Sequence, residues 1–397
     1  MDYKLNIKGM VIDGSFIYDE NLGIYFITKP DFYSLDFSGD TDIEINDGAI
    51  TLKDGDNYNF YKINYQEKYV YVIGKKDKEL IDVEYKKLEE LDEDFDSNFV
   101  LNILAEIKIL PTGDYICSSV CDYISVIENL DKKYSNLDHF YRGHYYYKYQ
   151  LIPSLYRRAK YYNNEDLMYL EFKTKFYSQL ANKRYIDILT NMQHYNMPTR
   201  LLDTTSNPLV ALFMAVDRPI GFKNKGPAIG EVVLMNEEKK HVKYVGSNAV
   251  ILLSSLAVLE TKYKQELYEK IIEAQEKNDP KIYQESIAYK RFVAEVHNEL
   301  PYFDESFFNP KVLLKPRHVK VGMMNERIIA QSGNFILFGL CNYNTGEYMP
   351  LKTVAKERIF IVNKEKIINQ LDMLNINSAS MYPDMDHTAS AIKKRFE

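Results

Sequence analysis

The pattern of apolar residues changes once along this chain, near residue 90, and that change restricts the fold more than any other feature. Before it, short aromatic and β-branched runs are separated by turn pairs such as Asp13-Gly14 and Asp54-Gly55, which favour antiparallel hairpins. Beyond the acidic residues 89–96, helical periodicity alternates irregularly with short apolar runs. The sequence therefore predicts an α+β protein that begins with a small antiparallel β domain, a sandwich or a barrel, over residues 1–97.

The composition indicates a folded protein that stays inside the cell. Of the 397 residues, 46% are hydrophobic and 27% are charged, which is ordinary for globular proteins. Three cysteines are too few for a disulfide framework, which points to a reducing compartment. The sequence shows neither an export signal nor the roughly 20 consecutive apolar residues that cross a bilayer. We therefore expect a cytoplasmic protein without a membrane partner.

Charge is distributed unevenly between the two parts of the chain. Residues 1–100 hold 11 Lys and Arg against 23 Asp and Glu, which leaves 39 against 34 for the remainder. The acidic N-terminal part is a poor partner for nucleic acid, and we expect it to recognise a protein trigger or target. The mildly basic remainder tolerates an anionic ligand, although an uneven solvated surface explains the same numbers.

After a helical connector over residues 98–135, the sequence predicts one mixed α+β domain over residues 136–397. Cys117 and Cys121 are expected on one face of the connector's second helix. Asn207 is expected to cap a helix that begins with Pro208, and Asn363 to cap the closing helix. The other expected elements are strands at residues 140–147, 201–205, 229–235, 335–340 and 358–362, a long helix at 164–195, a helix at 209–216, a helical insertion at about 248–300 and a closing helix at 365–374.

The first candidate site segment is an aromatic strand that contains an arginine. On a strand, Phe140, Arg142 and His144 share one face, and Gly143 presents bare backbone on the other. An arginine among aromatic residues suits bidentate capture of a phosphate or a carboxylate. The alternative is an arginine that pairs with an internal acid, and the spacing alone does not decide between the two.

The second segment, residues 193–205, holds His194, Thr199, Arg200, Asp203 and Thr205 at the junction of a long helix and an apolar strand. Such junctions often carry sites, because the scaffold fixes the loop. Asp203 can accept from Arg200 or orient His194, and the helix that follows points its positive dipole end toward the segment. The alternative is a structural ion pair with turn capping.

The third segment places Arg327 and Gln331 four residues apart, just before a glycine turn and an apolar strand. By itself it is typical of an ordinary strand entrance. The chain contains no P-loop, nucleophile elbow or zinc-protease helix. Its seven histidines are scattered along the sequence, so we expect no metal.

These three segments, in this order, resemble the FRG-domain family. The Phe-Arg-Gly that names the family stands here as Tyr141-Arg142-Gly143, and the resemblance is strongest in QHYNMPTRLLDTTSNPLVALFMAV. It continues through Arg327, Gln331, Gly333 and Phe335 to a closing segment at residues 382–386. The resemblance covers roughly residues 118–397 and leaves residues 1–97 outside it.

The layout also resembles, more weakly, the ADP-ribosyltransferase fold, with its split sheet. In the arginine-containing class of those enzymes, the arginine of an aromatic-Arg-Gly strand holds the phosphates of NAD. A later strand leads into a helix through a Ser-Thr-Ser, similar to Thr204-Thr205-Ser206 here. A third strand supplies a glutamate that hydrogen-bonds the nicotinamide ribose. Gln331 takes that glutamate's place, so either Asp203, Glu326 or another acid supplies the charge, or the domain binds a nucleotide without efficient transfer.

The resemblance implies an intracellular, NAD-using ADP-ribosyltransferase-like effector, such as a toxin or a phage-defence protein, that modifies a protein or nucleic-acid acceptor. NAD is then the substrate. The residues implied as catalytic are Arg142, His194, Asp203 and Gln331, and those implied to bind the cofactor are Arg142, Gly143, Thr199, Arg200 and Thr205. Two other functions stay open, namely a non-catalytic nucleotide or anion sensor and a hydrolase or nuclease that uses His194 and Asp203.

Overall fold

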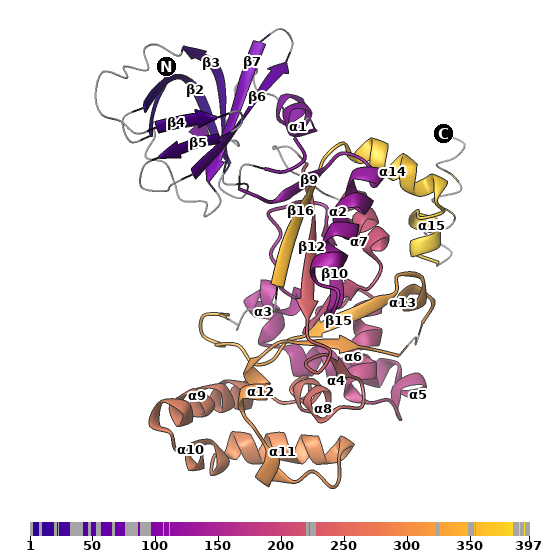
Figure 1. Ribbon diagram of the computed structural model, residues 1–397. Coiled ribbons are helices and arrows are strands. Elements are labelled where there is room, and N and C mark those ends of the chain that lie inside the picture. The colour runs from indigo at the N-terminus through magenta and orange to yellow at the C-terminus, as the bar shows by residue number, and fades with distance from the viewer. Residues whose placement is uncertain are drawn as a thin grey trace.

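The structure is a computed structural model of the 397-residue chain (Figure 1). It describes residues 3–7, 10–19, 22, 24–31, 43–46, 49–52, 57–65, 68–75, 86–87, 97–105, 107–110, 112–219, 222, 228–322, 325–347, 353, 355–383, 389 and 393. The acidic stretch at residues 89–96 lies outside the described residues, as do residues 384–386 of the closing motif.

The N-terminal part forms one sheet in which the strand order is β1-β2-β3-β7-β6-β5-β4, with β8 paired to β2. Every pairing except that of β8 is antiparallel. The strands are β1 (Tyr3–Ile7), β2 (Met10–Asp19), β3 (Ile24–Asp31), β4 (Ile43–Asn46), β5 (Ala49–Leu52), β6 (Asn57–Tyr65), β7 (Lys68–Lys75) and β8 (Lys86–Lys87). The antiparallel pattern agrees with the sequence prediction, whereas a sandwich or a barrel stays a prediction.

A second, mixed sheet carries the candidate site, and with the surrounding helices it confirms the predicted α+β class. Its strand order is β13-β14-β15-β11-β10-β12-β16-β9. The pairs β13–β14 and β16–β9 are parallel, and the others are antiparallel. The strands are β9 (Tyr115–Cys117), β10 (Asp138–His144), β11 (Leu201–Thr205), β12 (Gly230–Glu237), β13 (Lys243–Tyr244), β14 (Arg317–Lys320), β15 (Gly333–Leu337) and β16 (Ala355–Ile361).

This second sheet is divided at its centre. A single residue pair, Tyr141 with Thr205, joins β10 to β11, whereas β10 and β12 pair over seven residues. In Figure 1, β12 and β16 run steeply while β15 runs across them. The sheet therefore consists of two four-stranded halves that diverge on either side of the Tyr141–Thr205 pair.

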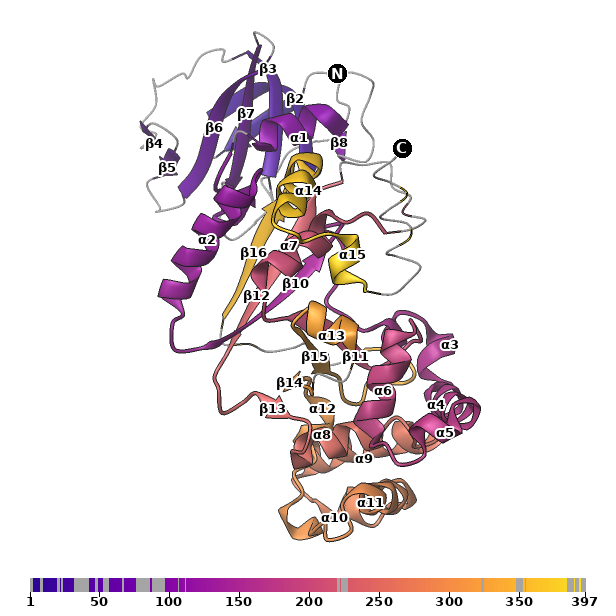
Figure 2. The ribbon, with the colours of Figure 1, turned by 90° about the vertical axis from the view of Figure 1, so that its right-hand side faces the viewer.

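Helices cover one face of the half formed by β9, β16, β12 and β10 (Figure 2). They are α2 (Val120–Lys133), α7 (Pro208–Val216), α14 (Lys364–Met373) and α15 (Ser378–Met381). Their apolar residues share one buried cluster with Tyr141 of β10, whereas the neighbouring Phe140 belongs to the cluster on the opposite face. The expected alternation along this strand is thus confirmed. As predicted, Asn207 caps α7, because its side chain accepts from Leu209 N.

The remaining helices surround the other half-sheet and bury the largest apolar cluster. They are α3 (Ala159–Tyr162), α4 (Glu165–Lys175), α5 (Tyr177–Leu180), α6 (Tyr185–His194), α8 (Asn248–Ser255), α9 (Thr261–Lys277), α10 (Lys281–Gln284), α11 (Ile287–Glu299), α12 (Lys311–Leu314) and α13 (Glu326–Ala330). Helix α1 (Ser97–Ala105) contributes to a third cluster that also includes residues of β3, β7, β9 and β16.

Three local predictions were wrong. Cys117 lies in strand β9 rather than on a helix with Cys121, because Tyr115 and Ile116 pair with β16 far along the chain. The expected long helix at residues 164–195 is divided into α4, α5 and α6. Asn363 adopts a left-handed conformation and does not cap α14 with its side chain.

His318 on β14 makes stability depend on pH. Its ring is 2% exposed and stacks on Phe140 at 4.2 Å, and neither ring nitrogen has a hydrogen-bond partner among the described residues. Burial lowers the pKa of His318 from 6.5 to about 4. Because the unfolded chain binds this proton near pH 6.5 and the folded chain does not, stability is full above pH 6.5 and is lost as the pH falls toward 4.

We therefore expect acidification from pH 7 to 4 to remove about 3 kcal/mol through this group, at about 1.4 kcal/mol per pKa unit. His318→Phe keeps the aromatic stacking and has no proton to bind, so its free energy of unfolding should lose correspondingly less over that range. Urea denaturation of both proteins at pH 7, 5.5 and 4 measures the difference. Parallel pH dependences of the two proteins would show that His318 is not responsible.

Candidate functional site

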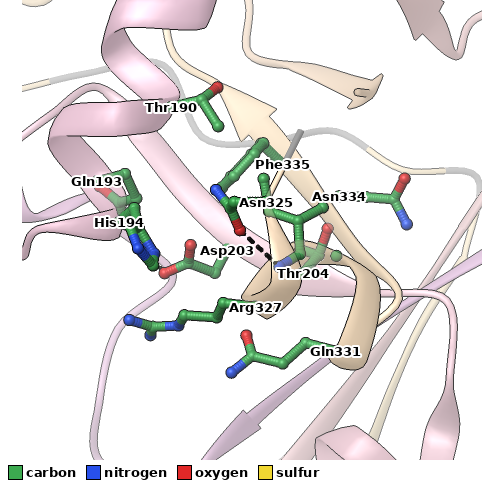
Figure 3. Close-up of a pocket in the computed structure, with 12 residues that line it drawn as sticks. Thr190, Gln193, His194, Asp203, Thr204, Asn325, Arg327, Gln331, Asn334 and Phe335 are labelled. Carbon is green, nitrogen blue, oxygen red and sulfur yellow. Dashed lines mark hydrogen bonds between the residues drawn. The ribbon is translucent and has the colours of Figure 1, made fainter. Parts of the chain in front are cut away.

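A polar cleft lies beside the line where the two half-sheets diverge (Figure 3). Its volume is about 360 Å³ out to its open mouth, but only about 30 Å³ of it has room for the centre of a water molecule. It is lined by Thr190, Gln193, His194, Asp203, Thr204, Asn325, Arg327, Ile328, Gln331, Gly333, Asn334 and Phe335. The second and third sequence segments, more than a hundred residues apart, thus meet in one cleft, and His194, Asp203 and Gln331 are brought together as predicted.

Asp203 on β11 is held in a fixed orientation. Its Oδ2 accepts from Gln193 Nε2 at 2.9 Å, and the Gln193 amide oxygen accepts from Thr199 Oγ1 at 2.5 Å. Thr199 is fully buried, so this chain of hydrogen bonds starts from the protein interior. The second carboxylate oxygen, Oδ1, has no hydrogen-bond partner in the described part of the chain and is available to a ligand.

Gln331 follows α13 and closes one side of the cleft. Its side chain is 7% exposed and donates from Nε2 to Met381 O at 3.0 Å. Its backbone oxygen accepts from Thr205 Oγ1 at 2.6 Å, and Thr205 Oγ1 also accepts from Asn207 N at 2.9 Å. Fully buried Thr205 therefore joins Gln331 to the start of α7 and does not itself line the cleft.

His194 and Arg327 complete the polar lining. His194 lies at the end of α6, and Figure 3 shows its ring beside the Asp203 carboxylate. Arg327 on α13 lies with its guanidinium carbon 5.2 Å from the centre of the Tyr382 ring. Arg327 is half-buried at the cleft, and its N–H groups make no hydrogen bond or ion pair with the described residues. Sequence reasoning noted Arg327 in the third segment but did not select it as a site residue.

Thr204 adds an unsatisfied polar atom to the same cleft. The residue is 4% exposed, and its buried Oγ1 has no hydrogen-bond partner among the residues that the structure describes. Buried hydroxyls are usually paired with protein or ordered water. Its position in the lining therefore indicates that the cleft receives a polar group of a ligand or a water molecule.

Arg142, expected at the centre of the site, does not line this cleft. Its Nη1 donates to the backbone oxygen of Asp203 at 2.6 Å, and its Nε donates to His144 Nε2 at 2.9 Å. Burial lowers the pKa of Arg142 to about 10, so the group stays charged at neutral pH. Of the four residues implied as catalytic, His194, Asp203 and Gln331 line the cleft, whereas Arg142 connects the two half-sheets behind Asp203.

A chain of buried polar groups fixes Arg142 from the other side. His144 Nδ1 lies 3.3 Å from Glu231 Oε2, and Glu231 is also paired with Arg358. Burial lowers the pKa of His144, which keeps its ring neutral. Since Nε2 accepts from Arg142, the ring proton sits on Nδ1 and is donated to Glu231. These contacts make Arg142 a support for the position of Asp203.

Arg200 and Gly143, both expected to bind the cofactor, have structural roles. Arg200 is fully buried, and it donates to both carboxylate oxygens of Glu165 and to the backbone oxygens of Phe338 and Gly339. No face of its guanidinium reaches the cleft. A Cβ on Gly143 would lie 2.0 Å from Ala211 O, so the glycine is required by the close approach of α7 and not by a ligand.

Among the described residues, no group of three or more His, Cys, Asp or Glu side chains is arranged to hold a metal ion. None of the helices described combines the length and apolar character that crossing a membrane requires.

The family model described as the FRG domain matches residues 138–224, which include β10, β11 and α7 and therefore the first two segments of the site. The third segment, with Arg327 and Gln331, lies beyond the matched range. No curated protein and no solved structure matches the chain. Residues 138–224 therefore match the FRG domain, the family that the sequence motifs resemble.

Proposed function

We propose that the cleft binds NAD and that the protein breaks its nicotinamide–ribose bond, as an ADP-ribosyltransferase-like effector in the cytoplasm. The observation that carries this proposal is the meeting of a carboxylate, an imidazole, a guanidinium and an amide in one cleft, from Asp203, His194, Arg327 and Gln331. The division of the sheet into two four-stranded halves beside the cleft supports the likeness to the ADP-ribosyltransferase fold.

Each of these groups fits one part of the reaction. Breaking the bond between the ribose C1′ and the nicotinamide nitrogen sends the electron pair to that nitrogen, which becomes neutral, and leaves positive charge on the ribose. The oriented carboxylate of Asp203 stabilises that charge. The nucleophile, an acceptor group or water, bonds to C1′ and gives its proton to His194. Gln331 hydrogen-bonds a ribose hydroxyl, and Arg327 binds a phosphate.

Two observations favour a second candidate, a non-catalytic nucleotide or anion sensor. The cleft is narrow, with about 30 Å³ of space against roughly 300–1,000 Å³ for sites that enclose drug-sized ligands. Gln331 also carries no charge at the position where the resembling enzymes have glutamate. A sensor shifts its melting temperature with NAD or a related nucleotide and leaves the nucleotide intact. A hydrolase or nuclease built on His194 and Asp203 instead leaves NAD inert.

Arg327→Ala is expected to weaken NAD binding about 10- to 100-fold, because hydrogen bonds to a charged partner contribute about 1.5–3 kcal/mol. Calorimetric titration of the full chain with NAD measures the change. Arg291→Ala is the matched control, since Arg291 also stacks on a tyrosine, 5.9 Å from the Tyr263 ring centre, but lies on α11 away from the cleft. If the two variants bound NAD with equal affinity, Arg327 would not belong to the NAD-binding site.

A further inference from the structure

A second, apolar pocket lies on the far side of α6 from the cleft. Its volume is about 740 Å³ out to its open mouth, and it is lined by Leu167, Met168, Glu171, Phe172, Lys175, Phe176 and Met197. We call it the α4 groove. Helix α6 lies between α13, which lines the cleft, and the α4–α5 pair, which forms the groove (Figures 1 and 2). The C-terminal end of α6 connects the cleft with the groove. His194 lines the cleft, and the ring of the next residue, Tyr195, lies 4.8 Å from the His194 ring.

The rim of the α4 groove presents large apolar side chains to solvent. Leu167 is 56% exposed, Phe176 42% and Tyr195 64%. The rings of Phe176 and Tyr195 are parallel at 6.4 Å, and both contact the buried Phe172. Contiguous exposed apolar residues around a concavity mark interaction sites. The flexible side chains of Met168 and Met197 let such a pocket adapt to an inserted side chain.

The charges around the groove indicate the chemistry of its partner. Residues 157–184 hold seven Lys and Arg against three Asp and Glu, although the whole chain has a net charge of −7. Two of those three acids, Glu165 and Asp166, are buried. Lys175 lines the groove and Lys183 is exposed just after α5, whereas the exposed Arg184 is paired with Asp187. An apolar pocket in a locally basic region favours an acidic partner.

A protein segment fits the α4 groove better than a nucleic acid does. The lining is largely apolar, and its two charged residues, Glu171 and Lys175, are of opposite sign, so it does not form the continuous basic track that a nucleic-acid backbone requires. The two exposed rings stack on each other rather than standing apart as a platform for bases.

We propose that the α4 groove docks an acidic protein segment through one bulky apolar anchor, and that this segment belongs to the acceptor whose modified group reaches the cleft at His194. Only the second half rests on the proposed function. Since α6 separates the groove from the cleft by a single helix, a docked segment brings neighbouring residues of the same protein to the mouth of the cleft.

Selection from a random peptide display library on the immobilised full chain tests the docking. The selected peptides should combine one aromatic or large aliphatic residue with several Asp or Glu. The affinity of the strongest peptide should fall about tenfold or more in Phe176→Ser, as for an interface anchor, and about tenfold in Lys175→Glu. The affinity should not change in the control Tyr302→Ser, because Tyr302 is 96% exposed and does not line the groove. Lys175→Glu is an exposed change that keeps the test valid if Phe176→Ser folds poorly.

The docking proposal is overturned if no peptide is enriched on wild type over Phe176→Ser, if the enriched peptides are basic, or if a labelled oligonucleotide binds with the same dependence on Phe176 and Lys175. NAD consumption by Phe176→Ser without any acceptor should equal that of wild type. If wild type leaves NAD intact while acidic peptides are selected, the proposed function fails and the docking stands. If NAD is consumed and no peptide is selected, the docking alone fails.

Discussion

Replacing Arg200 with alanine is expected to lower the free energy of unfolding by about 3–5 kcal/mol, because it removes two charge-assisted hydrogen bonds from buried Glu165 and empties a fully buried site. Arg200 donates from Nε and Nη2 to Glu165 at 2.7 and 2.5 Å, and Lys264 Nζ lies 2.7 Å from the same carboxylate. All three side chains are 1% exposed or less. Although burial alone would raise the pKa of Glu165, the charges of Arg200 and Lys264 hold it below its usual value.

Denaturant unfolding of the full chain measures this loss. The matched control is Lys262→Ala, which breaks the exposed pair between Lys262 and Glu260 and should leave the free energy of unfolding almost unchanged. Replacing Arg200, Glu165 and Lys264 together by apolar residues of similar size should cost much less than Arg200→Ala, since no charge is then left buried. A cost below about 1 kcal/mol for Arg200→Ala would disprove the structural role of this cluster.

Replacing Asp203 with asparagine is expected to slow nicotinamide release from NAD about 10²- to 10³-fold, the size of effect seen when one preorganised electrostatic group is removed. Asparagine keeps the shape of the side chain and an oxygen that can accept from Gln193, so the change is confined to charge. Single-turnover measurement with saturating NAD isolates the chemical step from binding.

Glu326→Gln is the control for Asp203→Asn, because Glu326 is the other acid that the sequence places near Gln331. It lies at the exposed start of α13 and does not line the cleft. We expect its rate to stay within about twofold of wild type, as for a surface change away from the site. Gln331→Glu should raise the rate, because it adds a second negative charge beside the ribose. If Glu326→Gln slowed nicotinamide release and Asp203→Asn did not, the acid that stabilises the positive charge would be Glu326 and not Asp203.

The sequence correctly predicted features that depend only on neighbouring residues, such as the start of a helix or the two faces of a strand. Asn207 before Pro208 predicted the start of α7, and the alternation of Phe140, Tyr141 and Arg142 predicted the two faces of β10. The grouping of His194, Asp203 and Gln331 followed from the family resemblance, and the cleft agrees with it. These predictions needed only neighbouring residues or a known motif order.

The features that were missed depend on contacts between distant parts of the chain. Strand β9 is three residues long and is defined by pairing with β16, more than two hundred residues later. Arg200 was assigned to a ligand because its partner, Glu165, lies on a separate helix and nothing in the spacing connects them. Arg142 and Arg327 have the same chemistry in the sequence, and only the divergence of the half-sheets decides which of them faces the cleft.

The most direct test of the account is the release of nicotinamide when the full chain is incubated with NAD labelled in that ring. We predict release by wild type that continues with water as the acceptor and that falls to background in Asp203→Asn, while Lys262→Ala releases nicotinamide at the rate of wild type. Intact NAD after prolonged incubation with folded wild type, or equal release by wild type and Asp203→Asn, would contradict the assignment of this cleft as the site of glycosidic bond cleavage.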